Sequence, residues 1–175
     1  MTFSQSVLAL LALIAACAFF SIAEIAMAAS RRLRLRQMAD DGDARAQKVM
    51  RIQEQPGNYF TVVQVGVNAL AILGGIVGEG MLSPYFTDLY LWWLPEPTAG
   101  TMGFLTSFLL VTSLFILGAD LMPKRLSMAI PEELAVRVIG PMILLMTVFR
   151  PLVWFYAKVA EKLMKLFKPV SYTHL

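Results

Sequence analysis

The chain has 175 residues, is 58% hydrophobic and carries a formal net charge of +3. Its mean hydropathy of +0.65 is too high for an ordinary soluble domain, so the composition predicts a membrane protein. The single cysteine, Cys17, excludes a disulfide framework and a thiolate metal site, and the lone histidine, His174, argues against a histidine metal site.

The first predicted membrane span covers residues 7–29, an apolar run that no Lys or Arg precedes. A secretory signal peptide normally has a basic region before a shorter apolar run, so we predict a retained span. Glu24 lies near the cytosolic end of this span, and Ser21 lies three residues earlier on the same helical face. An ionisable side chain in a span costs at least ~2.5 kcal/mol and usually faces a partner or a watery cavity. This face is therefore expected to line a polar site.

A polar segment with helical character follows at residues 31–58. Residues 31–36 contain four arginines, and beside a span such a cluster is typical of an orientation and lipid-headgroup signal rather than of nucleic-acid binding. The DDGD sequence at 40–43 is a turn signal. We expect two short juxtamembrane helices at the cytosolic surface and no nucleic-acid partner.

The second predicted span, at about residues 59–77, carries two amides and a dense set of glycines. Gln64 and Asn68 are four residues apart and share a helical face. An amide in lipid must find a polar partner, either in a site or on a neighbouring helix. Gly74 and Gly75 indicate tight backbone contact or local unwinding that exposes carbonyls, and plain close packing explains them equally well.

Residues 79–100 are predicted to form a loop, because they are rich in aromatic residues and prolines. This segment contains no Lys or Arg, whereas every basic residue lies in 31–51, at 124–125 or from 137 onward. The positive-inside rule therefore places those three basic regions in the cytosol, and the N-terminus and the aromatic loop outside.

The third predicted span, at about residues 102–122, ends in a polar turn. Gly118 and Asp120 lie near its boundary, and the helix is expected to break at Pro123 and Lys124. Backbone carbonyls freed by the proline, together with Asp120, suit an oxygen-rich cation site. An ordinary surface carboxylate paired with a neighbouring basic residue explains Asp120 equally well.

The last segment, at about residues 134–167, is predicted to be a kinked amphipathic helix. Its apolar core at 138–149 is too short to cross a bilayer, and Arg150-Pro151 interrupts it. A fourth crossing would place the C-terminal lysines outside, so we expect a belt helix along the cytosolic membrane face, with a fourth span as the alternative. Residues 169–175 are expected to be a disordered or non-native tail.

Oxygen-bearing side chains and turns from all three spans make up the predicted substrate site. Its members are Ser21, Glu24, Gln64, Asn68, Gly118 and Asp120. Two carboxylates without a fixed cation in the apolar runs favour a positively charged ligand. The chain shows no nucleophile triad, no P-loop and no zinc-ligand spacing, so we expect neither an enzyme nor a resident cofactor. Three spans do not enclose a wide polar path, whereas a homodimer would.

Three motifs resemble one family of membrane domains. They are AFFSIAEIAMAASRRLRLR in the first span, QVGVNALAILGG in the second and GADLMPKRL in the third. Together they resemble the DUF21 domain of the CorC/HlyC and CNNM (cyclin M) family, over about residues 1–168. The details are most similar to the bacterial branch described as exporting polyamines such as putrescine and cadaverine.

The resemblance implies an all-α membrane protein with three transmembrane helices, two juxtamembrane helices and a belt helix. It implies a homodimer in the bacterial inner membrane, with cytosolic CBS modules in the longer chain. In magnesium-transporting relatives a divalent ion is the substrate, and carried over to this chain its ligands would be Ser21, Asn68 and Asp120. Here Ala119-Asp120 replaces the usual Gly-Glu and Val67-Asn68 the usual amide pair. Both changes leave more room for a bulkier organic cation.

Three functions follow as hypotheses. The first is export of a polyamine, the second is transport of Mg²⁺ or another divalent cation, and the third is a non-transporting membrane anchor for regulatory modules. The anchor hypothesis explains the spans but leaves Glu24 and Asn68 without a role.

Overall fold

The computed structural model describes residues 3–166, and every regular element in this range is a helix, as the sequence predicts. The elements in chain order are α1 (Phe3–Ala29), α2 (Arg32–Asp40), α3 (Ala44–Glu54), α4 (Gly57–Tyr90), α5 (Glu96–Leu114), the π-helix η1 (Phe115–Leu121), α6 (Met122–Ala129), α7 (Pro131–Val148) and α8 (Arg150–Leu166). The expected tail at 169–175 lies outside the described residues.

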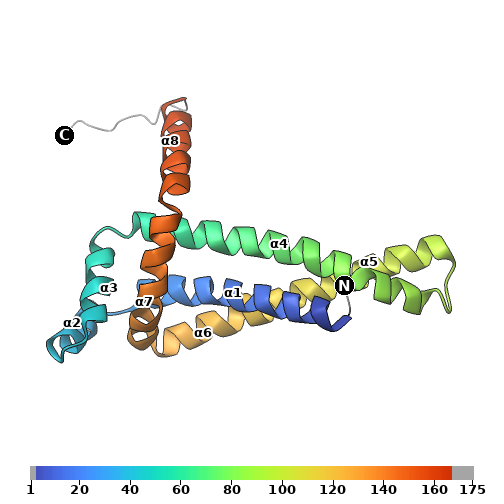
Figure 1. Ribbon diagram of the computed structural model, residues 1–175, viewed down its shortest axis with the longest axis horizontal. Helices are drawn as coiled ribbons and strands as arrows, with labels where there is room; N and C mark the ends of the chain where they lie inside the picture. The colour runs from blue at the N-terminus through green and yellow to red at the C-terminus, as the bar shows by residue number, and fades with distance from the viewer. Residues whose placement is uncertain (1–2, 167–175) are drawn as a thin grey trace, which may run out of the picture.

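Three long apolar helices form the body of the molecule (Figure 1). They are α1, α4 and the continuous run of α5, η1 and α6, and each is long and apolar enough to cross a membrane. The three predicted spans are thus confirmed as helices of spanning length, although each helix continues beyond the predicted limits.

The predicted loop at residues 79–100 is wrong over most of its length. Helix α4 continues to Tyr90 with Pro84 inside it, and α5 begins at Glu96. Proline and glycine are poor helix formers in water, but a long membrane helix tolerates them because its other backbone groups remain paired. The two helices form a hairpin that extends past the end of α1 (Figure 1).

Helix α1 packs against α4 along one face. The Tyr59 hydroxyl donates a hydrogen bond of 3.0 Å to the Ala23 carbonyl. The ring of Phe20 lies against Gly66, where an added Cβ would come within 2.5 Å of the ring. Small residues allow this close approach, which is how helices gain packing contacts in lipid.

Helix α1 also contacts the third apolar run. Ile14 lies against Gly118 of η1, and the Ser127 hydroxyl of α6 is 3.5 Å from the Ile22 carbonyl. The residues of α1 are therefore held between α4 on one face and η1–α6 on the other. This arrangement decides which side chains meet inside the bundle.

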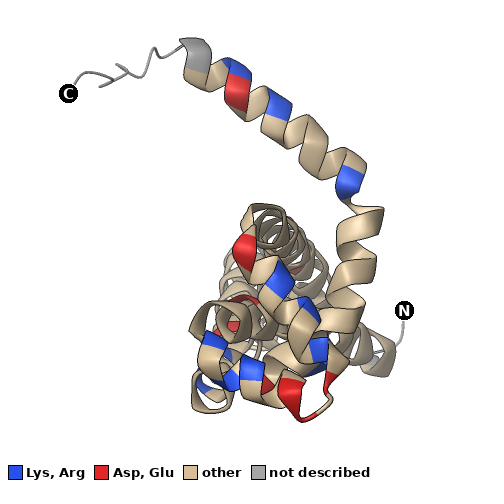
Figure 2. Ribbon diagram, turned by 90° about the vertical axis from the view of Figure 1, so that its left-hand side faces the viewer, with Lys and Arg blue, Asp and Glu red and all other residues tan. Residues whose placement is uncertain are grey.

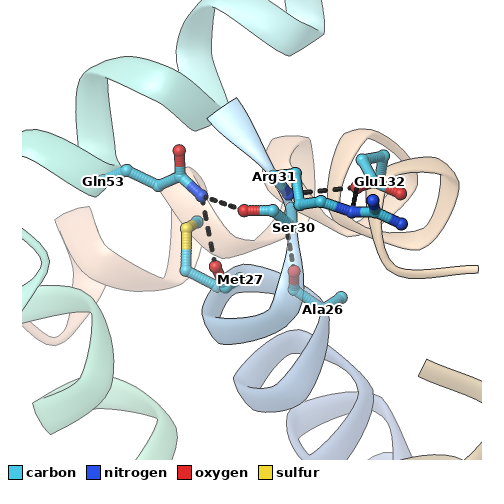
Figure 3. Close-up of polar contacts among 6 residues, drawn as sticks. All are labelled: Ala26, Met27, Ser30, Arg31, Gln53 and Glu132. Carbon is cyan, nitrogen blue, oxygen red and sulfur yellow. Dashed lines mark hydrogen bonds and ion pairs between the residues drawn. The ribbon is translucent and has the colours of Figure 1, made fainter. Parts of the chain in front are cut away.

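Polar contacts hold the end of α1 to α3 and α7 (Figure 3). The Gln53 amide donates to the carbonyls of Met27 at 3.3 Å and Ser30 at 3.1 Å. The backbone N–H of Arg31 donates to the Glu132 carboxylate at 3.0 Å. A helix leaves its last carbonyls without intrahelical partners, so Gln53 supplies donors where α1 ends.

The short helices α2 and α3 pack with α7 at one end of the molecule. Leu35, Val49 and Ile139 are fully buried there. A turn with Gly42 at a φ of 100° joins α2 to α3, and this left-handed backbone favours glycine. Figure 2, which views the molecule from this end, shows Lys and Arg residues gathered on it.

Helices α7 and α8 meet at a bend of 66° between Val148 and Arg150. Pro151 lies in the first turn of α8, where a missing N–H is tolerated, whereas Pro141 lies inside α7 without ending it. The break therefore falls at the predicted Arg150-Pro151 position. By length and composition, the bent pair of α7 and α8 is sufficient for one broken membrane span. The structure is therefore compatible with both the predicted belt helix and its alternative, a fourth span.

Candidate functional site

A π-helical stretch interrupts the third span where the sequence places its polar turn. Residues Phe115–Leu121 form η1, which contains Gly118 and Asp120. Pro123 is the second residue of α6, just after η1, and cannot donate a hydrogen bond to the carbonyl one turn earlier, at Ala119. Widened turns of this kind occur frequently at functional sites. The predicted helix break at Pro123 and Lys124 is wrong, because the helix continues through both residues to Ala129. The sequence analysis did not predict the π-helix.

The carboxylates of Glu24 and Asp120 meet around the ammonium group of Lys124. Lys124 Nζ lies 2.6 Å from Asp120 Oδ1, one helical turn away, and 3.9 Å from Glu24 Oε2 on α1. Two carboxylates and one ammonium leave this group of three side chains with one excess negative formal charge. All three side chains are partly exposed, at 31% for Glu24, 34% for Lys124 and 48% for Asp120. The chain itself therefore does not enclose the cluster, whose formal charge is negative.

Ser21 and Gly118 lie close to this cluster in the fold. Ser21 is buried on α1, one turn before Glu24. Gly118 lies two residues before Asp120, against Ile14 of α1. Gly118 therefore belongs to the contact between α1 and the third span.

The predicted amides lie elsewhere on the surface of the bundle. Gln64 and Asn68 are exposed on α4, and within the described part of the chain neither is hydrogen-bonded to the carboxylates. The carbonyl of Val67 accepts a weak hydrogen bond of 3.9 Å from the Cys17 thiol, so this turn of α4 lies against α1. Asn68 thus lies beside the α1–α4 contact, with its side chain exposed.

The described residues contain no group of three or more His, Cys, Asp or Glu side chains placed to hold a metal ion. The predicted divalent-cation ligands Ser21, Asn68 and Asp120 therefore rest on the resemblance alone.

Pairing with a neighbouring basic residue was one of the two alternatives for Asp120, and Lys124 is that residue. We predicted a site without a fixed cation in the apolar runs, whereas Lys124 lies inside the third candidate span, which extends over Glu96–Ala129. The spacing of four residues between Asp120 and Lys124 was a usable signal, because such residues are neighbours on a helix. Nothing in the sequence indicated that Glu24 would join them.

The fold and the site together define a helical membrane domain with a charged cluster between its first and third long helices. The family described as "Cyclin M transmembrane N-terminal domain" matches residues 8–174. The chain therefore belongs to the cyclin M transmembrane domain family, and the predicted family is confirmed.

Several curated proteins are similar to this chain. A protein of Salmonella typhimurium named "Polyamine export protein" is 50% identical over 164 residues, and one of Escherichia coli K12 with the same name is 48% identical. Each alignment covers 94% of this chain and 37% of the relative. An uncharacterized protein of Mycobacterium tuberculosis is 33% identical over 163 residues, with 93% of this chain and 46% of the relative covered. The chain thus spans less than half the length of each of these relatives.

Proposed function

We propose that this chain is the membrane domain of a transporter that exports an organic cation, with a polyamine such as putrescine or cadaverine as the favoured cargo. The observation that carries the proposal is the Lys124 ammonium held between Asp120 and Glu24. A primary alkylammonium group is also what each end of a diamine presents. A site that accepts this group from its own lysine has the charge and hydrogen-bond acceptors to accept it from a cargo molecule.

In this proposal Lys124 occupies the cation site while no cargo is bound. One ammonium group of an arriving diamine donates a hydrogen bond to Asp120 in place of Lys124, which moves away. The return of Lys124 to Asp120 then releases the cargo. The exchange replaces one ammonium by another, so no carboxylate is left without a partner inside the membrane. The second ammonium group of the diamine needs a second acceptor. Glu24 is the available carboxylate, because it lies beside the position that Lys124 Nζ occupies.

The printed names of the relatives in Salmonella typhimurium and Escherichia coli support a polyamine as the cargo. Transport of Mg²⁺ is the second candidate, favoured by the buried hydroxyl-bearing Ser21 one turn from Glu24. A non-transporting anchor remains the third hypothesis. It gives no reason for two carboxylates and a lysine to meet inside apolar helices.

The proposal includes a bacterial inner-membrane location, with the N-terminus outside and the C-terminus in the cytoplasm. The gathering of Lys and Arg at the end formed by α2 and α3 supports this orientation (Figure 2).

The proposal also includes a homodimer. Gln64 and Asn68 are exposed on a spanning helix, and amides at membrane depth need polar partners that a second copy would supply. The greater length of the relatives is consistent with further cytosolic modules, such as the expected CBS pair.

A flux assay on the whole protein in liposomes tests the proposal, with putrescine and Mg²⁺ compared side by side. We expect putrescine flux, and we expect Glu24→Gln and Asp120→Asn each to reduce it by at least about tenfold, because each removes a charged acceptor. Glu133→Gln is the matched control, since Glu133 is exposed on α7 and outside the cluster. Flux of Mg²⁺ alone would favour the second candidate, and absence of both fluxes would favour the anchor.

A further inference from the structure

A groove of about 760 Å³ lies where α3, α4, α7 and α8 meet. Basic residues from two elements border it, namely Lys48 and Arg51 of α3 and Arg150 of α8. Its apolar lining includes Val62 of α4, Ile143 of α7 and Trp154 of α8. The bend between α7 and α8 thus sets positive charge beside an apolar surface.

The charge of the groove is uncompensated. No carboxylate lines it, and Lys48, Arg51 and Arg150 form no ion pair with any residue that the structure describes. Lys158 adds a cation near the groove, with its Nζ 6.0 Å from the centroid of the Trp154 ring. Glu54 of α3 borders a neighbouring hollow together with Arg51, but its ion pair is with Arg32 of α2.

The groove lies at the level where a candidate span begins. Val62 is in the second turn of α4, whose spanning run starts at Gly57. The basic residues of the groove come from the polar end of the molecule, which Figure 2 shows carrying many Lys and Arg residues. A molecule bound here would therefore place a polar part at the membrane surface and an apolar part along the spanning helices.

We propose that this groove binds an anionic phospholipid of the adjoining leaflet. Lys48, Arg51 and Arg150 contact the phosphate of the headgroup, and an acyl chain lies along Val62, Ile143 and Trp154. Arginine matches the geometry of a phosphate with paired N–H groups, and basic pockets between membrane helices are suited to acidic headgroups. The site is independent of the carboxylate cluster, because the two share no residue.

Native mass spectrometry of the purified whole protein, incubated with equal amounts of phosphatidylglycerol and phosphatidylcholine, tests this proposal. We expect phosphatidylglycerol to be retained in preference to phosphatidylcholine by about tenfold. The double variant Arg51→Gln, Arg150→Gln should lose most of that preference. The control Arg34→Gln, Arg137→Gln removes the same charge from exposed positions outside the groove and should keep it.

Three results would overturn the proposal. Equal retention of the two lipids by the unmodified protein would show that the groove does not select an anionic headgroup. Equal losses in both double variants would show that binding reflects general positive charge instead of this groove. Retention of the preference in the Arg51 and Arg150 variant would place the lipid elsewhere.

Discussion

Two acid–base pairs in this molecule have similar N···O distances but lie in different surroundings. At the α2–α3 turn, Asp43 and Arg45 pair at 2.9 Å. In the third span, Asp120 and Lys124 pair at 2.6 Å, with Glu24 nearby. The first pair belongs to a polar segment, where ion pairs contribute little to stability. The second lies within a helix of membrane-spanning length, where an unpaired charge is costly. We therefore expect the surroundings of each pair, more than its N···O distance, to decide how much it contributes to the free energy of unfolding.

The largest contrast is expected from removing the base of each pair. Lys124→Gln leaves the carboxylates of Asp120 and Glu24 without a cation between them. After allowing for their partial exposure, we expect the free energy of unfolding to fall by about 2 kcal/mol. Arg45→Gln should leave the thermal unfolding midpoint in detergent almost unchanged. Equal midpoints for the two variants would mean that the membrane-level pair contributes no more than the surface pair.

A second contrast concerns two adjacent glycines in α4. An alanine at Gly74 would run into the ring of Phe115, whereas an alanine at Gly75 would enter open space. Because the ring must shift, we expect Gly74→Ala to cost about 1 kcal/mol, and Gly75→Ala to be close to neutral. Thermal unfolding of the two variants measures the difference. A larger cost at Gly75 would indicate that this position contacts something outside the described chain, such as a second copy.

The smallest effect is expected at the surface pair, as a pH dependence. Side-chain hydrogen bonds from Arg45 hold the pKa of Asp43 below its usual value. A lowered carboxyl pKa adds stability above the pKa of the unfolded chain, and this stability is lost as pH falls through the folded pKa. Asp43→Asn keeps an acceptor for the N–H of Arg45 at the start of α3 but does not titrate. Between about pH 6 and about pH 3, the thermal unfolding midpoint should therefore fall slightly more in the unmodified protein than in Asp43→Asn. Identical losses would show that the pairing is too weak to matter.

The spanning helices could be predicted because an apolar run of sufficient length is a strong signal in itself. The same logic failed at residues 79–90, where aromatic residues and Pro84 resembled a loop although the helix continues. Propensities measured in water weigh proline heavily, whereas in an apolar medium the pairing of the remaining backbone groups dominates.

The candidate site was predictable in its parts but not in its arrangement. Glu24 and Asp120 were identified because carboxylates are rare within apolar helices. The pairing of Asp120 with Lys124 was one of two alternatives, and the structure contains that pair. The approach of Glu24 depends on how α1 packs against η1 and α6, which no local pattern encodes. The exposure of Gln64 and Asn68 has the same origin, since it depends on which face of α4 meets α1.

Putrescine binding to the whole protein in lipid nanodiscs, measured by calorimetry for the unmodified protein and for Lys124→Gln, tests the central claim most directly. If Lys124 occupies the cation site and is free of it about a tenth of the time, its removal should tighten putrescine binding about tenfold. Asp120→Asn should abolish the binding. Putrescine binding that is unchanged or weaker in Lys124→Gln would contradict the account, because Lys124 would then be a structural partner of the carboxylates rather than a competitor of the cargo.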